Sequence, residues 1–453
     1  MWGFSAQSYA RGLRRPPLQP HTRTMSSLST KERFISMTCL ILIGELIFSL
    51  PFHVTRFFRP TVLEVFQFSN FELGAMFSAY GITGMVCYLP GGTIADRFSA
   101  RRLMAVSAFS TAFGGVYMAT IPSVFGMTVL YGYWGITSIL LFWAALIRST
   151  RVAGGAKEQG QAFGLLDSGR GLVAAGVASI IVYAYSTLLP TDIASASIEE
   201  RRAGLQMVIW SYTLLTFAVG VLVWWLIPED TSNEGAPSAT TLTLDRVKEV
   251  LSLPSVWMIA MTVICAYCAF KAVDNYAVFV VDAYGMNDVE AAELSTWAAW
   301  IRPIAALAIG FGSDRIATPR ATEWCFAVLA ASYVAFVLVE PMPGKTTILY
   351  ITVFVSAVVI YGLRALYFAL MESSSIPKGV TGTAVGVISL VGYTPDIFLM
   401  PIAGWLIDRS PGARGHQDFF GLMLGISLLG FFVVTRLQKH ISEQGPSTQD
   451  VRA

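Results

Sequence analysis

Charged side chains are scarce in this sequence. Asp, Glu, Lys and Arg make up 13% of the 453 residues, whereas hydrophobic residues make up 54%. Ordinary soluble proteins carry about 25% charged residues. A soluble chain of this length needs a polar surface that this composition does not supply, which argues against a large soluble protein. The mean hydropathy of +0.59 agrees. We therefore expect an integral membrane protein that crosses the bilayer several times.

Histidine and cysteine are also few, at four and five residues. The histidines are scattered and form no cluster with metal-ligand spacing, so we expect no metal site, no cofactor and no catalytic residue, which argues against an enzyme. All five cysteines lie in apolar runs. Cys265 and Cys268 have CxxC spacing but no partner pair, so we interpret the cysteines as buried and chemically quiet.

A strong net charge is absent as well. The formal net charge is +2, which gives no case for nucleic acid as a partner. Residues 1–30 contain four arginines and no acidic residue. This start is either an organellar transit peptide, an extension before a true start at Met25, or a disordered tail. We favour a disordered tail without function.

Long apolar runs are abundant. A helix needs ~20 apolar residues to cross ~30 Å of hydrocarbon, and a lone segment satisfies its backbone there only as a helix. We predict an all-α integral membrane fold of about twelve transmembrane helices in two halves of six, over residues 35–227 and 255–436, joined by a linker over 228–254. Tails are expected over 1–34 and 437–453. The predicted helices cover 35–57, 71–94, 103–121, 124–147, 161–187, 205–227, 255–282, 289–312, 321–340, 346–371, 381–405 and 417–436.

Lysine and arginine gather in the loops on one side of this layout. Because cytoplasmic loops carry an excess of these residues, both termini and the linker are predicted to be cytoplasmic. Within the linker, residues 242–253 have amphipathic helical spacing and are expected to lie along the membrane surface. The richer side holds Lys31, Arg33, Arg97, Arg101, Arg102, Arg148, Arg151, Lys157, Arg246, Lys248, Arg315, Arg320, Lys378, Arg436 and Lys439, and the other side Arg56, Arg59, Arg201, Arg202, Lys345, Arg409 and Arg414.

A charged motif interrupts the apolar runs twice, once in each half. Both copies follow the second predicted helix of their half, so the chain was built from two related halves. The first copy consists of Gly92, Asp96, Arg97, Arg101 and Arg102, and the second repeats it at one offset as Gly310, Asp314, Arg315 and Arg320.

This pair of motifs resembles the signature of the major facilitator superfamily of secondary transporters, with Ser99 in place of the usual second glycine. The resemblance covers about residues 30–440 and implies two halves that rock around a central cavity. It implies that Asp96 contacts the start of the helix over 381–405, near Thr381 and Thr383, and that Asp314 contacts the helix over 161–187, near Gly160. These latches would close the cytoplasmic side. Alternatively, the arginines serve only to anchor topology.

Charged residues inside predicted spans are costly and therefore mark functional candidates. The spans over 103–121, 205–227, 321–340 and 417–436 hold none in their middles, as in the superfamily, where these four helices stand outside. The candidates are the acids Glu45, Asp167, Asp274 and Asp396 and the cations Arg170, Lys271, Arg302 and Arg364, with Tyr361 and Tyr367 at helical spacing beside Arg364. Arginine suits carboxylate and phosphate groups, so the cations and tyrosines are predicted to bind an anionic substrate.

Two pairs of candidates also have a purely structural interpretation. Asp167 and Arg170, like Lys271 and Asp274, are three residues apart, so each pair could neutralise itself on one helix face. The acids are otherwise assigned to coupling.

Arg302 and Arg364 have no acid nearby on their own helices. We expect the counter-ion of Arg302 to be Asp274, Asp396 or an anionic substrate. Glu45 is the main candidate for proton coupling, because loss of water favours a neutral carboxyl group. Alternatively, a protonated Glu45 donates a hydrogen bond to a neighbouring helix.

The sequence thus predicts a monomeric secondary transporter, a symporter or antiporter, of a small anionic organic solute, with protons as a candidate coupling ion. We expect it in a plasma or inner membrane rather than an organelle. The alternatives are a transporter of a neutral solute, a non-transporting sensor on the same fold, and an integral membrane enzyme.

Overall fold

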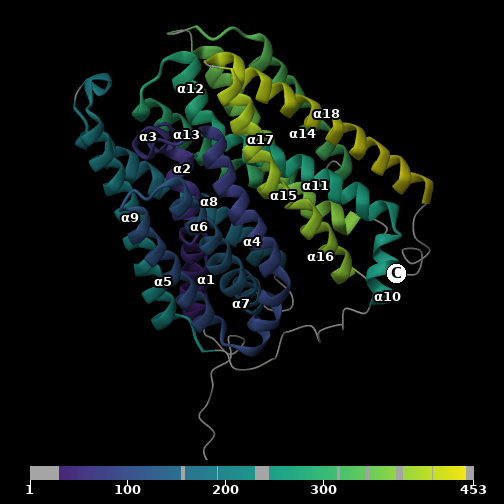
Figure 1. Ribbon diagram of the computed structural model, residues 1–453. Coiled ribbons are helices and arrows are strands. Elements are labelled where there is room, and N and C mark those ends of the chain that lie inside the picture. Colours follow the sequence, from purple (N-terminus) through teal and green to yellow (C-terminus); the bar gives the residue numbers. More distant parts are fainter. Residues whose placement is uncertain are drawn as a thin grey trace, which may run out of the picture.

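The computed structural model describes residues 30–154, 159–190, 192–229, 244–313, 317–342, 344, 346–373, 381–410 and 412–444. All regular structure in these ranges is helical (Figure 1). Several predicted features lie outside the described residues: positions 1–29 of the predicted tail over 1–34, most of the linker, Asp314 and Arg315. The first half contains α1 (Thr30–Leu46), α2 (Val54–Phe57), α3 (Arg59–Phe66), α4 (Asn70–Arg97), α5 (Ala100–Met118), α6 (Val124–Gly135), α7 (Ala144–Gly154), α8 (Gln159–Leu188) and α9 (Ile198–Leu226).

The second half follows a short linker helix, α10 (Leu244–Leu251), which packs against α11 and α16. Short π-helical and 3₁₀ segments join some of the α-helices, including η2 (Ser49–His53) after α1 and η3 (Ile136–Trp143) between α6 and α7. The α-helices of the second half are α11 (Pro254–Ala272), α12 (Tyr276–Tyr284), α13 (Asp288–Ser313), α14 (Thr318–Leu338), α15 (Thr347–Ser373), α16 (Thr381–Gly392), α17 (Pro395–Arg409) and α18 (Ala413–Gln444).

Nine helices of the described chain are long and apolar enough to cross a membrane, or ten if the bent α4 is one span. The two remaining predicted spans are α5, which packs along α9, and α13, which packs along α8. The predicted all-helical membrane fold is therefore confirmed. Helix extends slightly into both predicted tails, since α1 begins at Thr30 and α18 ends at Gln444.

Local sequence explains where several of these helices begin and bend. Ser69 caps α4, with its hydroxyl oxygen 3.1 Å from the amide of Glu72, while the Glu72 carboxylate accepts from the amide of Ser69 at 2.8 Å. Ser197 and Glu200 form the same capping box at the start of α9. Such boxes satisfy amides that a first helical turn leaves free. Pro90 lies inside α4, where the helix bends by 56°; a proline removes one helical hydrogen bond and kinks the helix.

Most helices of the first half lie on the left of Figure 1 and most of the second half on the right, whereas α12 and α13 of the second half lie beside α2 and α3. We call the ends that carry the start of α1, the end of α4, α10 and the end of α18 the linker side, and the other ends the opposite side. Near the opposite side, α4 and α17 cross so closely that a Cβ at Gly74 would lie 2.4 Å from the carbonyl oxygen of Met400. A Cβ at Gly404 would lie 2.3 Å from that of Asn70. Glycine is therefore needed at both points.

Polar contacts also join the halves on the opposite side. Asp408, at the end of α17, accepts hydrogen bonds from the backbone amides of Asn70 at 3.2 Å and Phe71 at 2.8 Å, so a carboxylate of the second half caps a helix of the first. Arg201 of α9 forms an ion pair with Asp288 of α13. Negative groups are favoured at a helix N-terminus, which bears a partial positive charge.

The linker side differs. Asp96 and Arg97 are exposed at the end of α4, and Asp96 makes no hydrogen bond or ion pair with any described residue. A Cβ at Gly92 would meet nothing within 4 Å. The close contacts between the halves described above therefore lie on the opposite side.

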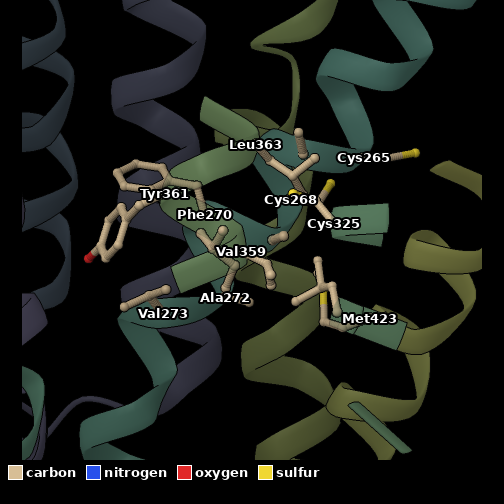
Figure 2. Packing of buried hydrophobic residues seen from close by; sticks show 14 of the residues in the cluster. Cys265, Cys268, Phe270, Ala272, Val273, Cys325, Val359, Tyr361, Leu363 and Met423 are labelled. Carbon is tan, nitrogen blue, oxygen red and sulfur yellow. The ribbon is translucent and has the colours of Figure 1, made fainter. Parts of the chain in front are cut away.

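The hydrophobic core of the second half contains three of the five cysteines. Figure 2 shows Cys265, Cys268 and Cys325 in this core, with Phe270 and Tyr361 at its edge. All five cysteines are free and buried. This agrees with their interpretation as packing residues.

Two arginines do not lie where the loop pattern placed them. Arg56 and Arg59 were counted among loop charges on the opposite side, but both side chains are buried inside the protein. Arg56 pairs with Asp274, and Arg59 donates to the side-chain oxygen of Asn70 at 3.1 Å. The prediction was wrong because Ser49–Phe66 continues as helix into the interface between the halves rather than ending at the membrane surface.

Candidate functional site

A central cavity lies between the two halves. The space that the centres of water molecules can reach within it is about 140 Å³. Among the described residues, α5, α9, α14 and α18 contribute nothing to its wall. The lining residues are Glu45, Phe48, Phe52, His53, Arg56, Tyr80, Gly81, Gly84, Met85, Tyr88, Ile139, Trp143, Arg170, Tyr267, Phe270, Lys271, Arg302, Arg364, Ser389, Leu390, Tyr393 and Asp396.

Arg302 is the centre of one charge network in the cavity wall. Its guanidinium nitrogens lie 3.1 Å from Glu45 Oε1 and 3.0 Å from Asp167 Oδ1. The other oxygen of Glu45 lies 3.0 Å from Nε of Arg170, and His53 Nε2 lies 3.2 Å from Glu45 Oε1. The network joins α1, η2 and α8 of the first half to α13 of the second. We call these five residues the Arg302 network.

Lys271 is the centre of a second network. Its ammonium nitrogen lies 3.4 Å from Asp274 Oδ2 and 3.5 Å from Asp396 Oδ1, and Arg56 pairs with the other oxygen of Asp274. Tyr267 donates its hydroxyl to Asp396, at 2.9 Å from Oδ2. Within the part of the chain that the structure describes, every acid of both networks has a cationic partner.

Arg364 differs from the other cations of the cavity. Its guanidinium carbon lies 4.1 Å from the ring centroid of Phe270, a distance at which a cation is attracted to the ring face. Arg364 makes no ion pair or hydrogen bond with the described residues.

The charges around the cavity do not cancel. The wall carries five cations, Arg56, Arg170, Lys271, Arg302 and Arg364, and the two acids Glu45 and Asp396. Asp167 and Asp274 lie behind the wall and pair with these cations. With His53 neutral, the set keeps one excess positive charge, and the cation without an acidic partner is Arg364.

The model of the Major Facilitator Superfamily matches residues 41–398. The chain belongs to the major facilitator superfamily. It is therefore a secondary transporter of the bilayer with a small-molecule substrate, and the family consists of transporters rather than enzymes. The membrane enzyme considered from the sequence is thereby excluded.

Two inner membrane proteins of Escherichia coli (strain K12) are similar to this chain almost from end to end. The inner membrane protein YihN is 26% identical over 434 residues, which cover 92% of this chain and 97% of the relative. The inner membrane protein YqcE is 24% identical over 411 residues, which cover 89% and 93%.

Solved structures show the same major facilitator fold. A bacterial homolog of the human lysosomal transporter Spinster, in an inward-facing and unoccupied conformation, superposes with a TM-score of 0.71 at 14% identity, covering 91% of this chain and 99% of that one. The nucleoside transporter NupG superposes with a TM-score of 0.68 at 13% identity, covering 90% and 98%.

The structure brings most of the predicted site residues of this superfamily protein to the cavity. Glu45, Arg170, Lys271, Arg302, Arg364 and Asp396 line it, whereas Asp167, Asp274, Tyr361 and Tyr367 are not among the lining residues. Tyr361 is 3% exposed and packs on Phe270, with ring centroids 6.4 Å apart. The hydroxyl of Tyr367 lies 3.4 Å from that of Tyr393, which does line the wall.

The acidic partners of Arg302 were predicted incorrectly. Its counter-ions are Glu45 and Asp167 rather than Asp274 or Asp396. Glu45 also contacts Arg170, so its carboxylate lies between two arginines. The pairs three residues apart do form, at 3.9 Å for Asp167 with Arg170 and 3.4 Å for Lys271 with Asp274, but each belongs to a larger network.

Sequence reasoning gave His53, Arg56 and the aromatic lining residues no role. His53 and Arg56 lie three residues apart and eight or more beyond Glu45, at the helical spacing that would have placed them on one face. Tyr267 precedes Lys271 by one helical turn, which was the available signal for its place in the wall.

The motif residues on the linker side are positioned mainly by their own half. Arg101 and Arg102 pair with Glu229 beyond α9, and Arg148 of α7 donates to the backbone oxygens of Ala95 and Phe98. Gly310 lies in α13 and Arg320 is exposed in the first turn of α14. Asp96 makes no hydrogen bond or ion pair with a described residue, so the latch implied for it is not seen among these residues. The latch implied for Asp314 is not tested, because Asp314 and Arg315 lie outside the described residues.

Proposed function

We propose that this major facilitator protein transports a small anionic organic solute through the central cavity by alternating access. The observation that carries the proposal is Arg364, a cavity-lining cation that forms no ion pair with the described residues, in a cavity wall with one excess positive charge. A charge removed from water is costly unless it is paired. An anionic solute would supply the missing partner.

The geometry around Arg364 favours a carboxylate, phosphate or sulfonate group. Phe270 covers one face of the guanidinium, which leaves its edge, with paired N–H donors, for a ligand. Such an edge binds two oxygens of a planar or tetrahedral oxyanion at once. Arg170 and Arg302 are already paired with acids, so they contribute a positive field rather than a free binding edge.

We propose that the linker side is cytoplasmic and that the protein occupies an inner or plasma membrane. Support comes from the exposed cations on this side, among them Arg97, Arg102, Arg151, Lys248 and Arg320. The relatives YihN and YqcE are inner membrane proteins. Protons are the proposed coupling ion, since the cavity wall holds carboxyl groups and a histidine.

A thermal-shift screen of the purified protein tests the proposal. Gluconate, glycerol 3-phosphate and isethionate represent the three oxyanion classes, with glucose and glycerol as neutral counterparts. We expect stabilisation by at least one anion and by neither neutral compound. Arg364→Ala should weaken binding of that anion by about 2 kcal/mol, roughly thirtyfold in Kd, because one partner of a buried charge pair is removed. Arg364→Lys should retain part of the affinity.

Arg151→Ala is the matched control, because Arg151 is exposed on the linker side, outside both motifs and away from the cavity. Counterflow of the bound anion in liposomes then separates transport from binding alone. Equal stabilisation by a neutral compound, or an unchanged anion affinity in Arg364→Ala, would contradict an anionic substrate. Binding without flux would favour the sensor.

A further inference from the structure

His53 stands out in the Arg302 network as a histidine in a cavity of fixed charges. It ends the π-helical turn η2 (Ser49–His53), between α1 and α2, and lines the cavity with a side chain that is 3% exposed. Its Nε2 lies 3.2 Å from Glu45 Oε1. Its Nδ1 is buried and has no hydrogen-bond partner among the described residues.

The groups around His53 come from four elements. Glu45 lies on α1 and Arg56 on α2, Arg302 reaches the shared carboxylate from α13, and the ring of Tyr212 on α9 lies 5.9 Å from the imidazole. The arginines keep their charge at every physiological pH, and tyrosine stays neutral. Imidazole is the side chain whose charge ordinarily changes near neutral pH.

We propose that His53 is the proton-binding site that couples proton movement to anion transport; the proposal rests on the proposed function. In the neutral form, Nε2–H donates to the Glu45 carboxylate and Nδ1 carries a lone pair. A proton from the aqueous phase that faces the cavity binds at Nδ1 and forms the imidazolium. The Nε2–H bond to Glu45 persists, and the same proton leaves Nδ1 when the cavity faces the other phase.

The charge count of the Arg302 network explains why the proton belongs on His53 rather than on Glu45. Arg170 and Arg302 are balanced by Glu45 and Asp167 when His53 is neutral. A proton on Glu45 would leave both arginines with Asp167 as the one acid of the network. A proton on His53 keeps all four ionic contacts and adds a positive charge to the cavity wall.

That added charge links the proton to the solute. An anion in the cavity stabilises the imidazolium, and the imidazolium in turn strengthens anion binding by the same factor, because linkage between two sites is reciprocal. We therefore expect anion affinity in the wild type to fall as the pH rises through neutrality, by at least about tenfold between about pH 5.5 and about pH 8.

Proton uptake on anion binding tests the proposal. The purified protein, in weakly buffered detergent with a pH-sensitive dye, is mixed with whichever of gluconate, glycerol 3-phosphate or isethionate binds most tightly. We expect the wild type to take up protons in proportion to the anion bound. His53→Gln keeps an amide donor for Glu45, so it should bind the anion with little pH dependence and take up no proton. His53→Asn serves as a second variant, and monodisperse elution reports folding of both.

His416→Gln is the matched control. His416 also pairs with an acid, with Nε2 2.9 Å from Asp282 Oδ2, and its Nδ1 is likewise buried and unpartnered within the described residues, but it does not line the cavity. It should take up protons like the wild type.

Two results would contradict the role of His53 and leave the proposed anion transport intact. One is anion binding to the wild type without proton uptake. The other is normal proton uptake in folded His53→Gln or His53→Asn. Absence of binding for all three anions at both pH values would overturn the proposed function and this proposal together.

Discussion

Arg302 illustrates how single residues hold this cavity together. Its side chain is 8% exposed and contacts two carboxylates, one on α1 and one on α8, from its own position on α13. Inside a protein surrounded by lipid, an unpaired charge costs several kcal/mol, and the ionic contacts offset that cost only when the geometry is good. Arg302 is therefore a structural and an electrostatic part of the cavity wall.

Replacing Arg302 with Met should destabilise the protein by about 3 kcal/mol, because Glu45 and Asp167 are left with Arg170 alone. The variant Arg302→Met with Glu45→Gln should regain more than half of the loss, since it removes the excess carboxylate. Thermal unfolding in detergent measures both. If the double variant is no more stable than Arg302→Met, the two residues do not interact as the distances indicate.

The contact between α4 and α17 shows how single helices hold the two halves together. Gly74 and Gly404 let the two helices approach until backbone touches backbone, and the carboxylate of Asp408 caps α4 from the other half. Close glycine contacts strengthen helix association in membranes. The pair therefore holds the opposite side closed in this conformation.

A methyl group at Gly404 should open that contact. Gly404→Ala places a Cβ 2.3 Å from the carbonyl oxygen of Asn70, and such overpacking costs about 1–3 kcal/mol. We expect the equilibrium between conformations to shift about tenfold away from the one in which the opposite side is closed. Slower thiol labelling of a cysteine placed on the linker side would report this shift. Gly386→Ala on α16 is the control, because a Cβ there meets nothing within 4 Å; equal effects of the two substitutions would refute this assignment.

At the scale of the whole molecule, close contacts between the two halves gather on the opposite side, at Gly74, Gly404 and Asp408. The predicted sidedness can be tested with Ser389→Cys, since Ser389 lines the cavity on α16 and the five native cysteines are buried. If the linker side is cytoplasmic, a membrane-impermeant thiol reagent should label this cysteine in inside-out vesicles, and the bound anion should protect it.

Right-side-out vesicles provide the comparison for this labelling. Labelling there at an equal or higher rate would contradict either the proposed orientation or the closed opposite side. A cysteine at exposed Arg320, labelled in parallel, distinguishes the two: it reports sidedness alone, because it lies outside the cavity.

The sequence alone determined that the chain is an all-helical membrane protein and which of its helices stay away from the cavity within the described residues. These features follow from quantities that are local along the chain: the apolar length that crosses hydrocarbon, and the cost of a charge within such a length. The motif at Gly92–Arg102 and its copy indicated the major facilitator superfamily. For the same reason the sequence named six of the charged residues that line the cavity, from Glu45 to Asp396.

Only the tertiary structure decided which charges meet. Arg302 pairs with Glu45 across 257 residues of sequence, and Asp408 caps Asn70 across 338. Helical spacing gives the face of one helix and carries no information on the neighbour that this face meets, so the predicted partners of Arg302 were wrong. His53 acquires its proposed role for that reason as well: a histidine near a span end is unremarkable in sequence, and its meaning comes from the carboxylate and arginines that folding brings around it.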